Sequence, residues 1–234
     1  MKPPTMTSES SKQHLAAIKT KENLTEKDIP HLRNRWFREY KHRLGGMVNR
    51  LPPLQEVNHR IPLIEESKHY AYHLPRCADA LKQQLSNKIR LCTDANWWVM
   101  KSVPQATPML CTPKKSRNLQ TVFDCRKRND NTVKDVTPFP DQDQIRMDVA
   151  RAKYRSKIDL SNAYEQVWIE LEDVWKMAFA MIYRTFISQV MQQGDCNAPA
   201  TFQRLMTVIF RDHIGRCIYV YLDDIRLQRH IGGS

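Results

Sequence analysis

Tyr221-Leu222-Asp223-Asp224 lies almost at the C-terminal end of this 234-residue sequence, and the predicted fold depends on it. It follows Cys217-Ile218-Tyr219-Val220, an apolar, β-favouring run that predicts a buried strand. Two neighbouring carboxylates at the end of such a strand repel each other, and burial adds a desolvation cost. Divalent cations would neutralise the pair, whereas a hairpin turn would use the aspartates only for turn chemistry. These four residues leave both interpretations open.

The composition is strongly basic. Lysine and arginine number 37 against 25 acidic residues, which gives a formal charge of +12. This excess suits a polyanionic partner, with nucleic acid as the leading candidate. Six widely spaced cysteines without a CxxC pair argue against a zinc site and a disulfide scaffold. No apolar run is long enough for a membrane span, and the polar N-terminus lacks a signal-peptide core, so we expect an intracellular protein that is not secreted.

The first part of the chain predicts a polar segment and one helix. Residues 1–27 are rich in Ser, Thr and Lys and are predicted to be disordered. A helix is predicted after Asp28, ending at Gly45-Gly46, with apolar residues at every fourth position and basic residues between them: Leu32, Trp36, Tyr40 and Leu44. A nucleic-acid or membrane surface would suit such a helix, but packing against a neighbouring domain is the favoured interpretation.

The middle of the chain predicts a helix over 78–89, a short strand over 96–100 and a hairpin. The hairpin strands are Met109–Cys111 and Leu119–Phe123, joined by the basic turn 114–118. Six basic residues lie between Lys114 and Arg128, against one acidic residue. A solvated turn and a loop that faces phosphates are both compatible with this run.

Several further elements are predicted beyond the hairpin. One strand ends at Asp159, and Val167–Ile169 and Met177–Ala180 are predicted to pair around the turn 170–175. Asn197 is predicted to cap a helix that ends near Gly215, before the strand 219–224.

Three ordered motifs in this sequence resemble those of reverse transcriptases, most closely those of gypsy-type LTR retrotransposon polyproteins. They are Ile158-Asp159-Leu160, then Gln193-Gly194 before Asn197-Ala198-Pro199-Ala200-Thr201-Phe202-Gln203, and finally Tyr221-Leu222-Asp223-Asp224. The resemblance runs from about Leu51 to Ile225. It implies an RNA-directed DNA polymerase, a nucleotidyltransferase that adds deoxynucleotides to a primer on an RNA or DNA template.

The resemblance implies an α+β fold, the fingers and palm of a right-hand polymerase with an antiparallel palm sheet backed by helices. It assigns 1–50 to a basic, partly disordered linker with one helix, 51–134 and 167–197 to the fingers, and 135–166 and 198–234 to the palm. Only ten residues follow Asp224, so the palm is expected to be truncated before the thumb, with thumb and RNase H supplied by a parent polyprotein. The expected compartment is the cytoplasm, within a retroelement particle, or the nucleus.

The resemblance also implies site residues. Asp159, Asp223 and Asp224 would bind two Mg²⁺ ions, with Mn²⁺ as an alternative, for an in-line displacement. The substrate would be a deoxynucleoside triphosphate. Its phosphates would be bound by Lys114 (or Lys115), by the residue at position 120 and by the backbone amides of Asn162 and Ala163. Tyr164 would exclude a ribose 2′-hydroxyl or else be a core residue, and Gln193 and Gly194 would lie near nucleotide and template.

The sequence departs from the family pattern at several positions. Gln120 stands where an arginine usually contacts the α-phosphate, so a charge is lost. Arg184 and Met177 replace Gly and Thr, and all three changes are single transitions, as in a decaying element. The alternative is therefore a catalytically dead remnant that only binds nucleic acid. In either case, we expect residues 1–234 alone to show little or no primer extension.

Overall fold

Helix α2 (Ile29–Leu44) is the described element of the first of two units, residues 1–46 and 47–234. In this computed structural model the described residues are 29–44, 50–70, 75–152, 154–160 and 162–229. The predicted helix is present, and the rings of Trp36 and Tyr40 lie 4.9 Å apart on it, one turn from each other. The predicted disorder of 1–27 and the glycine pair at 45–46 lie outside the described residues.

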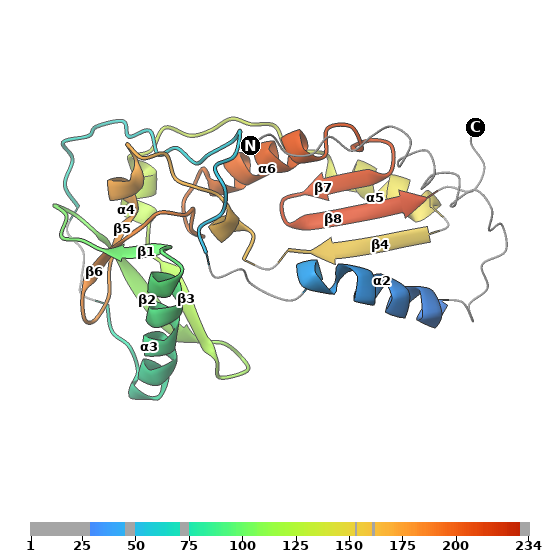
Figure 1. Cartoon of the computed structure of the whole chain (residues 1–234). Helices are drawn as coiled ribbons and strands as arrows, with labels where there is room; N and C mark the ends of the chain where they lie inside the picture. Colours follow the sequence, from blue (N-terminus) through green and yellow to red (C-terminus); the bar gives the residue numbers. More distant parts are fainter. Residues whose placement is uncertain (1–28, 45–49, 71–74, 153, 161, 230–234) are drawn as a thin grey trace, which may run out of the picture. The chain divides into compact units, whose positions relative to one another are not determined.

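A five-stranded sheet with the order β1-β6-β5-β2-β3 forms one part of the second unit (Figure 1). Its predicted hairpin is present as β2 (Thr107–Pro113) and β3 (Leu119–Phe123), which pair antiparallel. The other strands are β1 (Trp98–Met100), β5 (Ala178–Ala180) and β6 (Thr185–Ser188). Helix α3 (Asp79–Asp94) packs on β1, β2 and β3, burying Leu81, Leu85 and Cys92.

The core of this sheet is aromatic. Trp98, Phe123, Phe179 and Phe186 are almost fully buried. The ring of Phe179 lies 5.0 Å from Trp98 and 4.9 Å from Phe123, both in edge-to-face geometry. Such pairs add about 0.5–1.5 kcal/mol each beyond the area they bury, so this cluster holds strands from distant parts of the sequence together.

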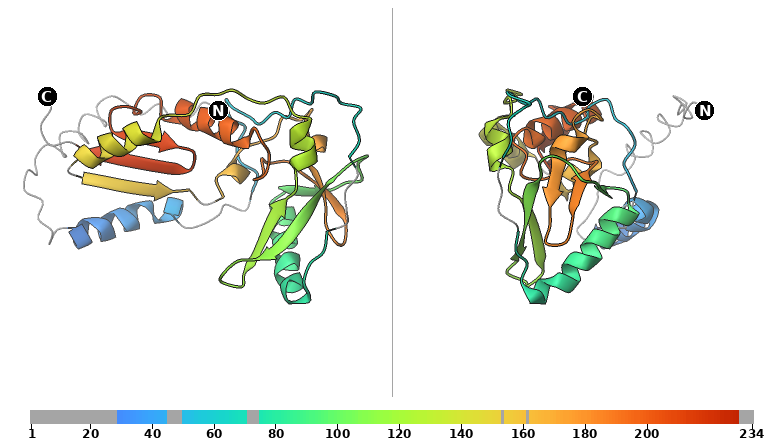
Figure 2. Two further views of the ribbon diagram at one scale, coloured as in Figure 1. Left: turned by 180° about the vertical axis from the view of Figure 1, so that it is seen from behind. Right: turned by 90° about the vertical axis from the view of Figure 1, so that its left-hand side faces the viewer.

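A three-stranded antiparallel sheet with the order β4-β8-β7 forms the other part of this unit. Its strands are β4 (Tyr154–Asp159), β7 (Ile218–Tyr221) and β8 (Asp224–Arg229). Helix α6 (Ala198–Ile209) contacts β7, and α5 (Gln142–Arg151) contacts β8, as both Figure 1 and Figure 2 show. Phe202 and Leu205 of α6 are buried against Val220 and Ile225. The apolar face of α6 therefore supports the strands on either side of Asp223.

A buried polar cluster joins three segments that are remote in sequence. Arg128, in the short helix α4 (Arg126–Asp130), donates through Nη2 to Asp195 Oδ2 at 2.7 Å. The second carboxylate oxygen accepts from the backbone N–H of Asn197 at 2.8 Å and lies 3.4 Å from Nε2 of His59. The Nδ1 atom of His59 lies 3.0 Å from Thr201 Oγ1, in helix α6. These contacts fix the loop that precedes α6.

The predicted pairing of Val167–Ile169 with Met177–Ala180 is wrong. Residues 167–169 form only isolated bridges, with His59 and Val190, and β5 pairs instead with β6 and β2. The predicted turn is present, with the backbone N–H of Asp173 donating to Glu170 O at 2.8 Å, and the buried Asp173 carboxylate accepts from the backbone N–H of Ile61. Short apolar runs carry no information about which partner they pair with, and tertiary packing decided it.

The second half of the chain differs from the sequence-based prediction at three points. Helix α6 ends at Ile209 rather than near Gly215. Asn197 occupies the N-cap position, but its side chain makes no capping bond and instead donates to Val133 O and accepts from Asp135 N. The predicted strand 219–224 is two strands joined by a turn, and residues 226–229 form most of β8. No helix among the described residues is long and apolar enough to span a membrane.

Candidate active site

The register of the three-stranded sheet places two of the three predicted metal-binding aspartates opposite each other. Asp159, the last residue of β4, pairs with Asp224, the first residue of β8. Asp224 also pairs with Tyr221, so Leu222 and Asp223 are the turn of the β7–β8 hairpin. The Tyr221–Asp224 stretch is therefore a tight hairpin turn at one end of this sheet, and the neutralisation of its aspartates by divalent cations stays a prediction.

The side chain of a buried glutamine, Gln203, is hydrogen-bonded to the backbone of this turn. Leu222 adopts φ 53°, which an L-residue takes up only at a cost. Its backbone N–H donates to Gln203 Oε1 at 2.9 Å, and Gln203 Nε2 donates to Val220 O at 3.3 Å. Gln203 lies in α6 with 2% of its surface exposed. Helix α6 therefore fixes the end of β7 and the first residue of the turn that carries Asp223.

Asp223 faces a cavity of about 230 Å³, which we call the polar cavity. The cavity lies between the β2–β3 hairpin, the segment 160–165 and the loop after β6. Seven of the predicted site residues line it: Lys114, Gln120, Asn162, Ala163, Tyr164, Gln193 and Asp223. These residues come from four separate stretches of sequence, and the fold brings them to one space.

Tyr164 forms part of the wall next to Asp223. It begins a short 3₁₀ helix, Tyr164–Gln166, and its ring stacks on Phe202 with centroids 5.4 Å apart. Burial, and secondarily the charge of Asp223, raises the pKa of the Tyr164 hydroxyl. The residue is therefore both packed against the core and exposed to the cavity. Asn162 precedes it with φ 50°, which turns the chain sharply after β4.

Lys114 lies at the end of the β2–β3 hairpin, and its backbone N–H donates to Asn118 O at 2.8 Å across the turn. Arg117 adopts φ 61° in this turn. Lys114 lines the polar cavity, whereas Lys115 is not among the lining residues. Gln120 faces the same cavity from β3.

Gly194 does not line the cavity but shapes the loop beside it. It adopts φ 106°, and a Cβ atom there would lie 2.8 Å from the carbonyl oxygen of Phe123. The Gly194 carbonyl accepts from Asn129 Nδ2 at 2.7 Å. Only glycine fits this close approach to β3, which positions Gln193 at the cavity wall.

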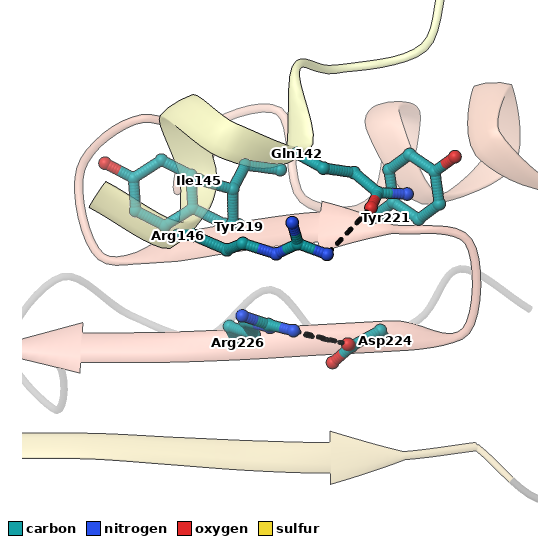
Figure 3. A pocket seen from close by; sticks show the side chains of 7 residues that line it. All are labelled: Gln142, Ile145, Arg146, Tyr219, Tyr221, Asp224 and Arg226. Carbon is teal, nitrogen blue, oxygen red and sulfur yellow. Dashed lines mark hydrogen bonds and ion pairs between the residues drawn. The ribbon is translucent and has the colours of Figure 1, made fainter. Parts of the chain in front are cut away.

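Asp224, the first residue of β8, lines a different cavity (Figure 3) from its neighbour Asp223, which lies in the hairpin turn and lines the polar cavity. That second cavity, about 190 Å³, lies between α5 and the β7–β8 hairpin. Asp224 Oδ2 accepts from Arg226 Nη2 at 3.0 Å and lies 3.5 Å from Lys157 Nζ. Burial raises the pKa of the Asp224 carboxyl, but Arg226 and Lys157 outweigh it, and the net shift is downward.

The three aspartates meet the requirements of a metal site only in part. No group of three His, Cys, Asp or Glu side chains within the described ranges lies close enough to hold an ion, so the predicted convergence of carboxylates is not present. The buried Oδ1 atom of Asp224 nevertheless has no hydrogen-bond partner, and no ion pair among the described residues involves Asp159 or Asp223. Carboxylate oxygens of this kind suit a hard cation.

Residues 104–228, more than half of the chain, match the family of the reverse transcriptase (RNA-dependent DNA polymerase). The chain belongs to the reverse transcriptase family. Among curated proteins of Drosophila melanogaster, the Pol polyprotein of transposon opus is 33% identical over 52% of this chain, and that of transposon 297 is 26% identical over 94%. The Pol polyprotein of transposon gypsy is 32% identical over 46% of it. The chain spans only 13%, 23% and 10% of these three polyproteins.

Solved structures share the fold of this chain. The protease–reverse transcriptase of prototype foamy virus aligns over 99% of this chain and 30% of its own, with TM-score 0.70 and 20% identity. The same type of viral protein in complex with an RNA/DNA hybrid aligns over 98% of this chain and 31% of its own, with TM-score 0.69 and 21% identity. The predicted α+β polymerase fold is thereby confirmed.

Three features of this reverse transcriptase domain were not predicted from the sequence. Gln203 lies on the buried face of α6, where its spacing resembles that of the apolar core residues. The Arg128–Asp195 pair, 67 residues apart, has no local sequence signature. Lys88 also lines the polar cavity, from helix α3, where it resembles any solvent-facing lysine. Only the tertiary structure shows the contacts of these four residues.

Proposed function

We propose that this reverse transcriptase domain carries out RNA-directed DNA synthesis and that the polar cavity binds the incoming deoxynucleoside triphosphate. The observation that supports this most is the gathering of Lys114, Tyr164 and Asp223, with four further predicted residues, around one space of about 230 Å³. A space of this size with cationic, aromatic and carboxylate walls suits a phosphorylated sugar and its counterions.

We assign a role to each wall of the cavity. Lys114 would bind the γ-phosphate, and Gln120 would donate an amide N–H to the α-phosphate. The backbone amides of Asn162 and Ala163 would bind the triphosphate, and the ring of Tyr164 would lie beneath the deoxyribose. Gln193, with Gly194 holding its loop, would contact the base pair between nucleotide and template.

We assign the two sheets to the two parts of a polymerase hand. The fingers would comprise 51–134 and 167–197, which hold all five strands of the larger sheet. The palm would comprise 135–166 and 198–234, which hold β4, β7 and β8. The loop containing Gly194 and the segment 160–165 then lie where these two parts meet, beside the polar cavity.

Asp159, Asp223 and Asp224 are the residues that would hold the divalent metal, and we propose two Mg²⁺ ions. When bound, such ions activate the primer 3′-hydroxyl and neutralise the leaving pyrophosphate. The register between Asp159 and Asp224 and the placement of Asp223 in the hairpin turn support this assignment. Asp223 can face the nucleotide directly because it lies in the wall of the polar cavity.

We propose primed RNA or DNA as the second substrate. The foamy virus relatives of this fold have been solved with double-stranded DNA and with an RNA/DNA hybrid. The formal charge of +12 supports binding to phosphates, and such binding weakens steeply as salt concentration rises.

The test is equilibrium binding of dTTP by the purified protein, in the presence and absence of Mg²⁺. Lys114→Ala should weaken binding roughly tenfold through loss of a charged phosphate contact, and Asp223→Asn should remove the dependence on Mg²⁺. Lys115→Ala is the matched control, since it removes the same charge from the same hairpin but not from the cavity. Equal effects at both lysines, or no dTTP binding at all, would exclude this function for the cavity.

A second candidate is a remnant that binds nucleic acid without catalysis. Arg226 and Lys157 on the Asp224 carboxylate favour it, because these cations occupy a group that a metal ion requires. Extension of a DNA primer annealed to RNA, with Mg²⁺ and all four deoxynucleotides, separates the two candidates. Binding of the primed template that persists without any extension, and without dTTP binding, would establish the remnant.

A further inference from the structure

Lys88 of helix α3 lines the polar cavity, which Asp223 also lines. Its side chain is half-buried, and Nζ donates to Thr121 Oγ1 at 2.7 Å. The same ammonium lies 5.8 Å from the centroid of the Trp98 ring. Thr121 is adjacent in β3 to Gln120, so the ammonium lies beside the residue that we assign to the α-phosphate.

Lys88 forms no direct ion pair within the described part of the chain. Lys82, two turns earlier in the same helix, instead pairs with Asp79 at 2.5 Å. Glu165 also lines the polar cavity; burial raises the pKa of its carboxyl, and the charge of Lys88 acts against that shift without a direct contact between the two groups.

A half-buried cation without a direct ion-pair partner carries a desolvation cost. An anion that enters the cavity would offset that cost. Lys88 and Lys114 are the two cations in the wall of the polar cavity, and they approach it from different elements, α3 and the β2–β3 hairpin. The neighbouring Gln120 contributes an amide but no charge. A triphosphate placed here would therefore have two lysines as its cationic ligands from the chain.

We propose that Lys88 is a triphosphate-binding residue that exchanges its bond to Thr121 for a phosphate oxygen when the nucleotide enters. The bond to a neutral hydroxyl holds the ammonium in place beforehand, and the Trp98 ring supports it from below by a cation–π contact. This inference rests on the function proposed above, since it presumes that the polar cavity takes a nucleoside triphosphate.

The experiment measures dTTP and tripolyphosphate binding by the purified protein carrying Lys88→Met. Methionine keeps an unbranched stem against Trp98 and removes only the charge, so the fold is retained; the unfolding midpoint checks this. We expect binding of both probes to weaken roughly tenfold. Lys88→Arg should retain most of the affinity, and Lys82→Met, a charge loss on the same helix outside the cavity, should leave it unchanged.

Gln120→Arg provides a second measurement. A guanidinium at position 120 supplies a cation beside Lys88, so Gln120→Arg should restore much of the binding that Lys88→Met loses. The two changes should therefore be non-additive in a double-mutant cycle.

The outcomes distinguish this inference from the proposed function. If Lys114→Ala weakens dTTP binding but Lys88→Met acts no more strongly than Lys82→Met, Lys88 does not bind phosphate and the cavity assignment stands. If the unaltered protein binds neither probe, or if no lysine in the cavity matters, both are overturned. Weakening of tripolyphosphate and dTTP alike, with rescue by arginine, supports a role in triphosphate binding.

Discussion

The interaction of single residues with Asp224 decides whether its carboxylate is available to a metal ion. Arg226 donates to Asp224 Oδ2 through both Nε, at 3.3 Å, and Nη2, at 3.0 Å, while the buried Oδ1 atom has no partner. Figure 3 shows this pair on β8, in the wall of the second cavity. The guanidinium therefore competes with a cation for the same group.

Arg226→Leu should strengthen binding of Mn²⁺, used as a paramagnetic probe, by about threefold to tenfold, because a charge-assisted bond to Asp224 is removed. Electron paramagnetic resonance of free Mn²⁺ gives the affinity without any need for catalysis. Arg146→Leu is the control, since Arg146 lines the same cavity but pairs with Asp143 at 2.9 Å. Equal affinities for all three proteins would show that Arg226 does not restrict the site.

Tyr164 should determine sugar selection if it lies beneath the deoxyribose. We expect Tyr164→Ala to reduce the preference for dUTP over UTP in equilibrium binding by roughly tenfold, because the ring that would collide with a 2′-hydroxyl is gone. Tyr164→Phe keeps the ring and its stacking on Phe202 and should retain the preference. An unchanged preference in the alanine variant would make Tyr164 a packing residue only.

At the scale of elements, the loop before α6 depends on one close backbone approach. Gly194→Ala would force a Cβ atom to within 2.8 Å of Phe123 O in addition to the strain of φ 106°. Gly215→Ala is the matched control, because Gly215 has φ 79° but no atom within 4 Å of its Cβ position. Urea denaturation should show Gly194→Ala to be the more destabilising by at least about 1 kcal/mol. Similar losses of stability for both variants would show that the loop accommodates the added Cβ atom without a measurable free-energy cost.

At the scale of the whole molecule, the buried Asp195 cluster couples stability to pH. Burial raises the pKa of the Asp195 carboxyl, but His59 and Arg128 outweigh it and bring the pKa to about 2, below its ordinary value of 3.8. A depressed pKa means that the stabilisation is fully present above about pH 4 and is lost as pH falls toward 2. It amounts to roughly 2 kcal/mol.

Asp195→Asn should destabilise the protein by roughly 3–5 kcal/mol at pH 7, because Arg128 remains buried without its anion. The difference in unfolding free energy between this variant and the unaltered protein should decrease by roughly 2 kcal/mol between pH 4 and pH 2, because the Asp195 carboxyl of the unaltered protein becomes protonated. Denaturant unfolding at a series of pH values measures it. Asp143→Asn, which removes an exposed ion pair with Arg146, should change stability little at any pH. If the difference in unfolding free energy between the two proteins did not change with pH, Asp195 would not contribute to the loss of stability in acid.

The sequence by itself determined the family, the α+β class and the order of the motifs, because these depend on short local patterns. The β2–β3 hairpin was also predictable, since it has an apolar pattern and a polar turn. The strand that ends at Asp159 was predicted as well, although all six of its residues are exposed. Seven residues of the polar cavity were predictable from the sequence, whereas Lys88 was not. Whether each holds metal or nucleotide stays a prediction that the experiments above test.

Only the tertiary structure decided the long-range pairings. It placed β5 between β6 and β2, folded the Tyr221–Asp224 stretch into a hairpin turn, and directed Asp223 and Asp224 into separate cavities. It also brought Lys88 to Thr121, across 33 residues, and Arg128 to Asp195, across 67. Contacts between segments so far apart leave no local pattern, because they depend on how whole elements pack, and packing is a property of the folded chain.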